Sequence, residues 1–190
     1  MKVSIDKAEE RTLERDINVI NNWWNKAASE LYNAGRLIYC VEIDGQSIFD
    51  NYEQVIVNNY HNIMEINIKS LSKKESIEET RISLNEYLDR FIPATLDIAD
   101  HFYSEVTEEQ WAEFSKFIEG LSWIVQSIQF LNLLTSDHDR YNLNSLELEA
   151  PIEELEQALE VKDYVLVADI IRYDLIPRLE QLLERTNKES

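Results

Sequence analysis

The sequence predicts a predominantly helical α+β fold: a long N-terminal helix, a small ββαβ sheet element and a C-terminal helical bundle. Over most of the chain, apolar residues recur at spacings of three and four, the period of amphipathic helices. A β-branched and aromatic run at residues 37–43 precedes Asp44-Gly45, a strong hairpin signal. Only three Gly and three Pro occur among 190 residues, so we expect the chain to fold rather than remain disordered.

The first helix is expected over residues 6–34. Asp6 and Glu9 have capping-box spacing at its start, and Gly35 lies where helices commonly end in a left-handed residue. We interpret its apolar stripe as packing within its own domain, but a coiled-coil seam between subunits stays open, because three heptads are too few to decide. The stripe has a period of 3.5 residues and consists of Leu13, Ile17, Ile20, Trp24, Ala27 and Leu31.

The next segment predicts a small sheet. Two strands flank Asp44-Gly45, a short helix with capping-box spacing between Asp50 and Glu53 covers residues 51–61, and a third strand contains Met64, Ile66 and Ile68. Such a sheet is stable only when another layer covers one of its faces. We expect the flanking helices to supply that layer.

The chain is expected to be helical from Ser72 to its end. Ser72 with Glu75, and Thr107 with Gln110, have capping-box spacing, and Pro93 should kink or restart the helix between them. This helix should end near Glu105.

Residues 111–131 form the most apolar helix of the chain, with only a narrow polar line. A helix that is apolar nearly all round must be covered on several sides. We favour a place at the centre of the bundle over one shared with a second subunit.

The last part predicts a loop at residues 136–144, followed by an αα-hairpin. Pro151 suits the first turn of one helix, and the other begins near Asp163. Pro177 should bend the second helix near Tyr173. We therefore predict an N-terminal unit over residues 1–71 and a helical bundle over 72–190, which could also pack as one compact unit.

The chain is strongly acidic, with 37 Asp or Glu against 18 Lys or Arg, a net charge of −19. Residues 1–75 hold 12 acidic and 9 basic side chains, whereas residues 76–190 hold 25 and 9. The charge and the lack of Lys/Arg clusters argue against direct binding to nucleic acid or to anionic membranes. They favour a basic protein partner. A single cysteine, Cys40, and the absence of a secretory pattern favour the cytoplasm.

Most motifs that would indicate catalysis are missing. Three isolated glycines cannot form a phosphate-binding loop, there is no serine nucleophile elbow, and Cys40 lies in a predicted strand with no histidine near it. His61 suits an ordinary surface position, and the Asp137-His138-Asp139 cluster suits a solvated loop. We expect no enzymatic activity and no cofactor.

One alternative is a metal-dependent enzyme. Asp97, His101 and Glu105 are spaced at i, i+4 and i+8, which would set an imidazole between two carboxylates on one helical face. Such a face could supply two or three metal ligands. A solvated face with local ion pairs is the ordinary alternative.

The main functional hypothesis is a non-catalytic intracellular interaction or scaffold protein. It would act through helical, acidic surfaces on a protein partner, with self-association as a homodimer left open. A protein that mimics nucleic acid is the third hypothesis. The acidic residues expected to form the interaction surface occur in a segment without a basic residue: Glu147, Glu149, Glu153, Glu154, Glu156 and Glu160.

Overall fold

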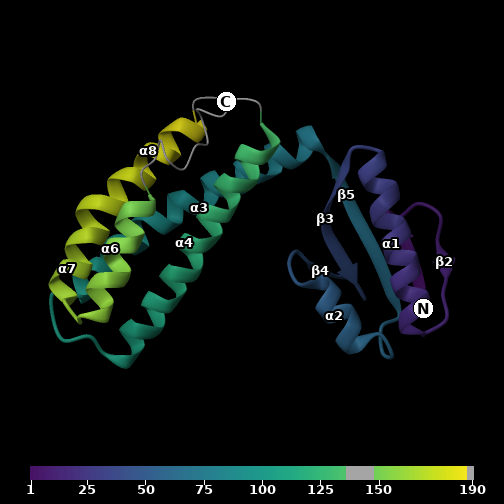
Figure 1. The fold of residues 1–190 in the computed structure, drawn as a ribbon, viewed down its shortest axis with the longest axis horizontal. Coiled ribbons are helices and arrows are strands. Elements are labelled where there is room, and N and C mark those ends of the chain that lie inside the picture. The colour runs from purple at the N-terminus through teal and green to yellow at the C-terminus, as the bar shows by residue number, and fades with distance from the viewer. Residues whose placement is uncertain (136–147, 188–190) are drawn as a thin grey trace. The chain divides into compact units, whose positions relative to one another are not determined.

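The computed structural model describes residues 1–135 and 148–187 and divides the chain into two compact units, Met1–Ser76 and Ile77–Ser190. The boundary lies within a helix, a few residues after the one expected from the sequence. The fold is α+β and predominantly helical, as predicted (Figure 1). The elements of the first unit are β1 (Lys2–Ile5), β2 (Arg11–Thr12), α1 (Ile17–Asn33), β3 (Arg36–Ile43), β4 (Gln46–Ile48), α2 (Tyr52–Asn59) and β5 (Glu65–Ser72).

The first unit is built on a five-stranded sheet with the order β2-β1-β5-β3-β4. Strands β1 and β5 run parallel, and the other neighbours are antiparallel. The predicted ββαβ unit is present as β3, β4, α2 and β5. Both residues of the Asp44-Gly45 turn have positive φ, 49° and 84°, as the predicted hairpin requires.

One face of this sheet forms the core of the unit. Val3 on β1 pairs with Ile66 on β5, and Val41 on β3 pairs with Ile68 on β5; all four are at most 1% exposed. Residues of α1 and α2 cover them (Figure 1), so one flanking helix, α1, supplies the expected layer together with α2, which belongs to the ββαβ element itself. The helical residues in this core are Ile20, Trp24, Ala27, Leu31 and Ile56.

The opposite face is polar but well ordered by hydrogen bonds. Asn67 Oδ1 accepts bonds from Ser4 Oγ and from the backbone N–H of Lys7, both at 2.9 Å. Asn67 Nδ2 donates to Glu42 Oε2 at 2.9 Å, and Lys69 Nζ lies 2.6 Å from the other oxygen of Glu42. The Lys69 ammonium and the Asn67 amide hold the pKa of Glu42 below its usual value.

The predicted start of the first helix is wrong. Helix α1 begins at Ile17, and the Asp16 carboxylate caps it by accepting the backbone N–H groups of Asn18 and Val19. Asp6 instead lies in a turn after β1 with φ = 50°. Its carboxylate accepts the backbone N–H and the hydroxyl of Ser70, both at 2.7 Å. Gly35 ends the helix with φ = 68°, as predicted.

The capping box predicted at the start of α2 is also wrong. Asn51 precedes the helix in a left-handed conformation and makes no side-chain capping bond. Glu53 bonds instead to Trp24 on α1, through the indole N–H at 3.1 Å. The Glu53 carboxylate, which its spacing from Asp50 placed in a capping box, therefore bonds to a side chain of another helix instead.

The second unit contains α3 (Lys73–His101), α4 (Glu108–Leu134), α6 (Glu149–Glu160), α7 (Tyr164–Asp169), a π-helical turn (Ile170–Leu175) and α8 (Ile176–Asn187), with the first turn of α3 belonging to the other unit. The capping boxes at Ser72 and Thr107 are both present, as predicted. Arg81 at the start of α3 donates to the backbone carbonyl of Thr186 in α8 at 3.0 Å, which ties the ends of the unit together.

Pro93 and Pro177 have different effects on the helices that contain them. Helix α3 continues through the exposed Pro93, so the predicted restart is wrong. Pro177 follows the π-helical turn, in which the N–H of Ile176 bonds to the carbonyl of Ile171, five residues back. The turn includes Tyr173, near which a bend was predicted. Pro177 has no N–H to donate to the carbonyl of Tyr173, four residues earlier, so the regular α-helical bonding is interrupted there.

Aromatic side chains join α3 to α4. Phe91 stacks on Phe117 with 5.6 Å between ring centroids, and Tyr87 packs against Phe91 and Trp123. Gly120 makes room for these rings: a Cβ there would lie 2.6 Å from the Phe91 ring and closer still to the Tyr87 hydroxyl.

Gly120→Ala should therefore destabilise the protein, although alanine is the better helix former. The rings of Tyr87 and Phe91 would have to move to admit the new methyl group, and overpacking of this kind costs about 1–3 kcal/mol. The better helix propensity of alanine offsets about 1 kcal/mol of that cost. Chemical denaturation should show a lower free energy of unfolding. Ser115→Ala, at an exposed site on the same helix, is the control and should stay within about 0.5 kcal/mol of the parent. A Gly120→Ala protein as stable as this control would contradict the packing argument.

Candidate functional site

Several surfaces of the described residues have the shape or composition of a binding site, and three of them differ clearly in character: the outer face of α4, the acidic face of α6, and a groove between α1 and α2. The first two lie in the second unit and the groove lies in the first. Each is built from residues of one or two helices.

Helix α4 is buried along one side only. Its inward residues include Phe117, Ile124 and Ile128, each at most 2% exposed. The opposite side, which we call the outer face of α4, remains exposed and consists of Ile118, Glu119, Ser122, Trp123, Gln126, Gln129, Phe130 and Leu133. The bundle therefore does not cover this helix on several sides, contrary to the prediction.

The outer face of α4 is apolar and almost free of charge. Leu133 is 81% exposed, and Ile118, Trp123 and Phe130 are each 36–39% exposed. Residues 120–135 contain no Asp, Glu, Lys or Arg, although the second half of the chain is strongly acidic. A contiguous exposed apolar face of this kind is typical of a contact surface.

By length and composition, α4 would also suffice to cross a membrane, the one such helix in the described ranges. Its most apolar stretch is 39% buried within the structure. Core helices of soluble proteins meet the same criterion, so we give this little weight.

The acidic face of α6 is a line of four carboxylates. Glu149, Glu153, Glu156 and Glu160 follow one another at spacings of four, three and four, and all are exposed. They project away from the buried residues of the helix, Pro151, Leu155 and Ala158. None of the four makes an ion pair with another described residue.

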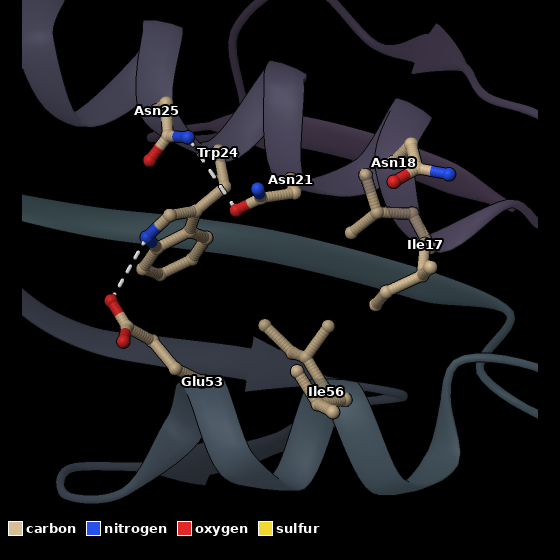
Figure 2. Close-up of a pocket in the computed structure, with 9 residues that line it drawn as sticks. Ile17, Asn18, Asn21, Trp24, Asn25, Glu53 and Ile56 are labelled. Atoms are coloured by element: carbon tan, nitrogen blue, oxygen red, sulfur yellow. Dashed lines mark hydrogen bonds between the residues drawn. The ribbon is translucent and has the colours of Figure 1, made fainter.

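A groove of about 350 Å³ lies between α1 and α2 (Figure 2). The hydrogen bond between Trp24 Nε1 and Glu53 Oε1 spans the two helices at one end, and Ile17 and Ile56 lie toward the other. Three asparagines of α1 form one wall. The full lining is Ile17, Asn18, Ile20, Asn21, Trp24, Asn25, Glu53, Ile56 and Val57.

Residues 79–185, more than half of the chain and most of its second unit, match the model of a family described as a domain of unknown function, DUF8042. The chain belongs to the DUF8042 family. No curated protein matches the chain, and no solved structure does. The outer face of α4 and the acidic face of α6 both lie within the DUF8042 segment, whereas the groove between α1 and α2 lies before it.

The second unit, which contains the matched segment, is called the DUF8042 unit from here on. The acidic residues predicted to form an interaction surface fall into three groups. Four form the acidic face of α6 described above. Glu154 is also exposed, but its position on the helix sets it apart from that line. Glu147 lies outside the described residues, as does the Asp137-His138-Asp139 cluster.

The structure does not assemble the metal-binding face predicted on α3. The helix ends at His101, so Glu105 does not continue the line of Asp97 and His101. His101 Nδ1 instead lies 3.5 Å from Glu113 Oε2 on α4. Within residues 1–135 and 148–187, no group of three or more His, Cys, Asp or Glu side chains is arranged to hold a metal ion.

The remaining candidates occupy ordinary positions. Cys40 is 1% exposed in β3, and burial raises the pKa of its thiol. His61 is exposed and packs its ring against Tyr60, with 3.8 Å between centroids. Neither is part of the three surfaces.

A second groove, of about 460 Å³, lies between α3 and α4. Arg90 and Lys116 line it together with Asp97 and Glu113, over a floor that includes Phe91. Because both signs of charge border this groove, its charge does not select a class of ligand.

Sequence reasoning did not find the groove between α1 and α2. Its one cross-helix signal is the pair Trp24 and Glu53, which are 29 residues apart. Glu53 was assigned to a cap, and nothing in the local pattern indicates an indole partner. The three asparagines at spacings of three and four were a usable signal, since asparagine is a weak helix former.

A polar contact holds the end of α3 against α7. Tyr103 Oη donates to Asp169 Oδ1 at 2.6 Å, and Arg172 bonds to Asp100 beside it. The bond to Asp169 raises the pKa of Tyr103 to about 12. The folded protein thus holds this proton more tightly than the unfolded chain does.

Stability should therefore depend on pH through Tyr103. The contribution is fully present below about pH 10, the usual tyrosine pKa, and is lost as pH rises through about 12. Unfolding midpoints measured from pH 9 to 12 should fall more steeply for the parent than for Tyr103→Phe, which cannot ionise. Parallel curves for the two proteins would show that the bond to Asp169 does not affect stability.

Proposed function

We propose that this protein is a non-catalytic protein–protein interaction protein whose DUF8042 unit self-associates through the outer face of α4. The single observation that carries the proposal is the combination found on that face. Four large apolar side chains are exposed there and Glu119 is the one charged residue of the face, in a unit that is otherwise strongly acidic.

Electrostatics favours a second copy of the chain as the occupant. Two copies that met through any acidic surface would bring like charges together, which is unfavourable. Two outer faces of α4 can meet along residues 120–135, which carry no charged side chain, so the two Glu119 carboxylates need not face each other. A two-fold dimer also uses the same surface on both subunits, so one apolar face is sufficient to build it.

The polar residues of this face suit a protein partner. Ser122, Gln126 and Gln129 lie among the apolar side chains, and amide groups can hydrogen-bond across an interface when it closes. Gln126 Nε2 donates to Ser122 Oγ at 3.3 Å, but a lipid surface would leave the other polar groups of this face without partners. We therefore propose that the outer face binds a protein rather than a membrane.

The acidic face of α6 is the proposed docking surface for a basic partner. Its four exposed carboxylates would steer such a partner and make the association sensitive to salt. A mimic of nucleic acid is less well supported. The carboxylates follow at about 5.5 Å along the helix, from a rise of 1.5 Å per residue, against about 3.4 Å between charges along one DNA strand.

Leu133→Glu should weaken self-association. Losing one buried leucine on each subunit removes roughly 3 kcal/mol in the dimer, about a hundredfold in dissociation constant, before any repulsion between the new charges. Light scattering and sedimentation over a range of concentrations would measure the shift to monomer.

Val161→Glu is the matched control, because it adds the same charge at a valine that is 75% exposed elsewhere in the DUF8042 unit. The control should leave the oligomeric state unchanged. A parent protein that is monomeric at high concentration, or a control that dissociates as Leu133→Glu does, would rule out this interface.

A further inference from the structure

We propose that the groove between α1 and α2 binds an alkyl-ammonium group, with the apolar stem on its isoleucines and the cation at Glu53. This site lies in the first unit and does not depend on the interface proposed for α4. The argument comes from the three kinds of surface that line the groove: an apolar floor, an amide wall and one carboxylate (Figure 2).

The floor of the groove can hold an aliphatic stem. Val57 is 50% exposed and Ile17 is half-buried, so these two offer apolar surface to a ligand, whereas Ile20 and Ile56 line the groove at only 2% and 4% exposure. The volume of about 350 Å³ falls in the range of small-molecule sites. An aliphatic chain on this floor would remove apolar surface of both partners from water.

The amide wall is made by one side of α1. Asn18, Asn21 and Asn25 share a helical face over a rise of about 10 Å. Asn25 Nδ2 donates to Asn21 Oδ1 at 3.5 Å, and the Asn18 side chain makes no hydrogen bond to another described residue. Most donors and acceptors of the wall therefore remain available to the polar groups of a ligand.

Glu53 carries the only charge that lines the groove. One of its oxygens accepts the Trp24 indole N–H, which fixes the carboxylate at the end of the groove. Its other oxygen accepts no hydrogen bond from the residues that the structure describes, and no Lys or Arg lines the groove. A positioned carboxylate beside apolar surface complements an organic cation.

The geometry favours ammonium over the other cations. A guanidinium binds best when both oxygens of a carboxylate are open to its planar fork, and Trp24 occupies one of them here. Calcium takes six to eight oxygen ligands, most of them from carboxylates and carbonyls, whereas the groove offers one carboxylate. An ammonium group can donate to the open oxygen of Glu53 and to amide oxygens of the wall.

This chemistry occurs in two sources: a free small alkylamine, and the lysine side chain of a partner protein. Titration calorimetry on the full chain can use n-hexylamine for the first and Nα-acetyl-lysine methylamide for the second. If the natural ligand is a free alkylamine, n-hexylamine should bind more tightly, and if it is a lysine side chain, Nα-acetyl-lysine methylamide should. n-Hexanol, which has the same stem without the charge, should bind at least tenfold more weakly than n-hexylamine.

Glu53→Gln is the decisive variant, since the amide oxygen can still accept the Trp24 indole N–H while the charge is lost. It should reduce affinity for the tighter-binding amine at least tenfold and leave the unfolding midpoint unchanged. Glu30→Gln removes an exposed charge elsewhere on α1 and should leave affinity unchanged. If Glu53→Gln does not fold, Val57→Phe, at a half-exposed site on the groove, should reduce affinity by obstruction.

Three results would overturn the proposal. The first is no binding of either amine, and the second is equal binding of n-hexylamine and n-hexanol. The third is an amine affinity that neither Glu53→Gln nor Val57→Phe lowers.

Discussion

The apolar residues of α4 extend nearly round the helix, and the unit that contains it covers only one side. Burial of Phe117, Ile124 and Ile128 on the inner side forms the core against α3 and the C-terminal helices. Gly120 is part of this constraint, because it allows the rings of Tyr87 and Phe91 to pack against the helix. The outer face consists of the side chains of α4 that this core does not bury. Both the stability of the unit and its proposed interface therefore depend on one helix.

The distribution of charge agrees with this division of the surface. The first unit is close to neutral, with 12 acidic and 9 basic residues, and the second holds 25 and 9. Within the second unit the carboxylates lie on surfaces such as α6, while residues 120–135 of α4 have none. Like charges repel where two acidic surfaces meet, so the uncharged stretch 120–135 of α4 is the surface along which we propose that two copies meet.

Local sequence predicted what local physics determines. Periodicity, the capping boxes at Ser72 and Thr107 and the turn at Asp44-Gly45 were sufficient for the α+β class, the hairpin and most helices. The errors lie where the partner of a side chain is distant in sequence. Asp6 bonds to Ser70 and Glu53 bonds to Trp24, so neither caps a helix. Strand β2, which has two residues and pairs with β1, is too short to show an alternation. Strand β1 was missed because parallel pairing with β5, 63 residues away in sequence, leaves no local pattern. The groove was missed for the same reason.

The central claim is that the outer faces of α4 meet in a dimer, and disulfide cross-linking tests that proximity directly. Single cysteines would be introduced at Ser122, Gln126 and Gln129, with Val161→Cys as the control. The native Cys40 is buried with a raised pKa and should react slowly. Mild oxidation should link two chains through at least one α4 position and not through Val161. Cross-links at Val161 alone, or at none of the four, would contradict the account.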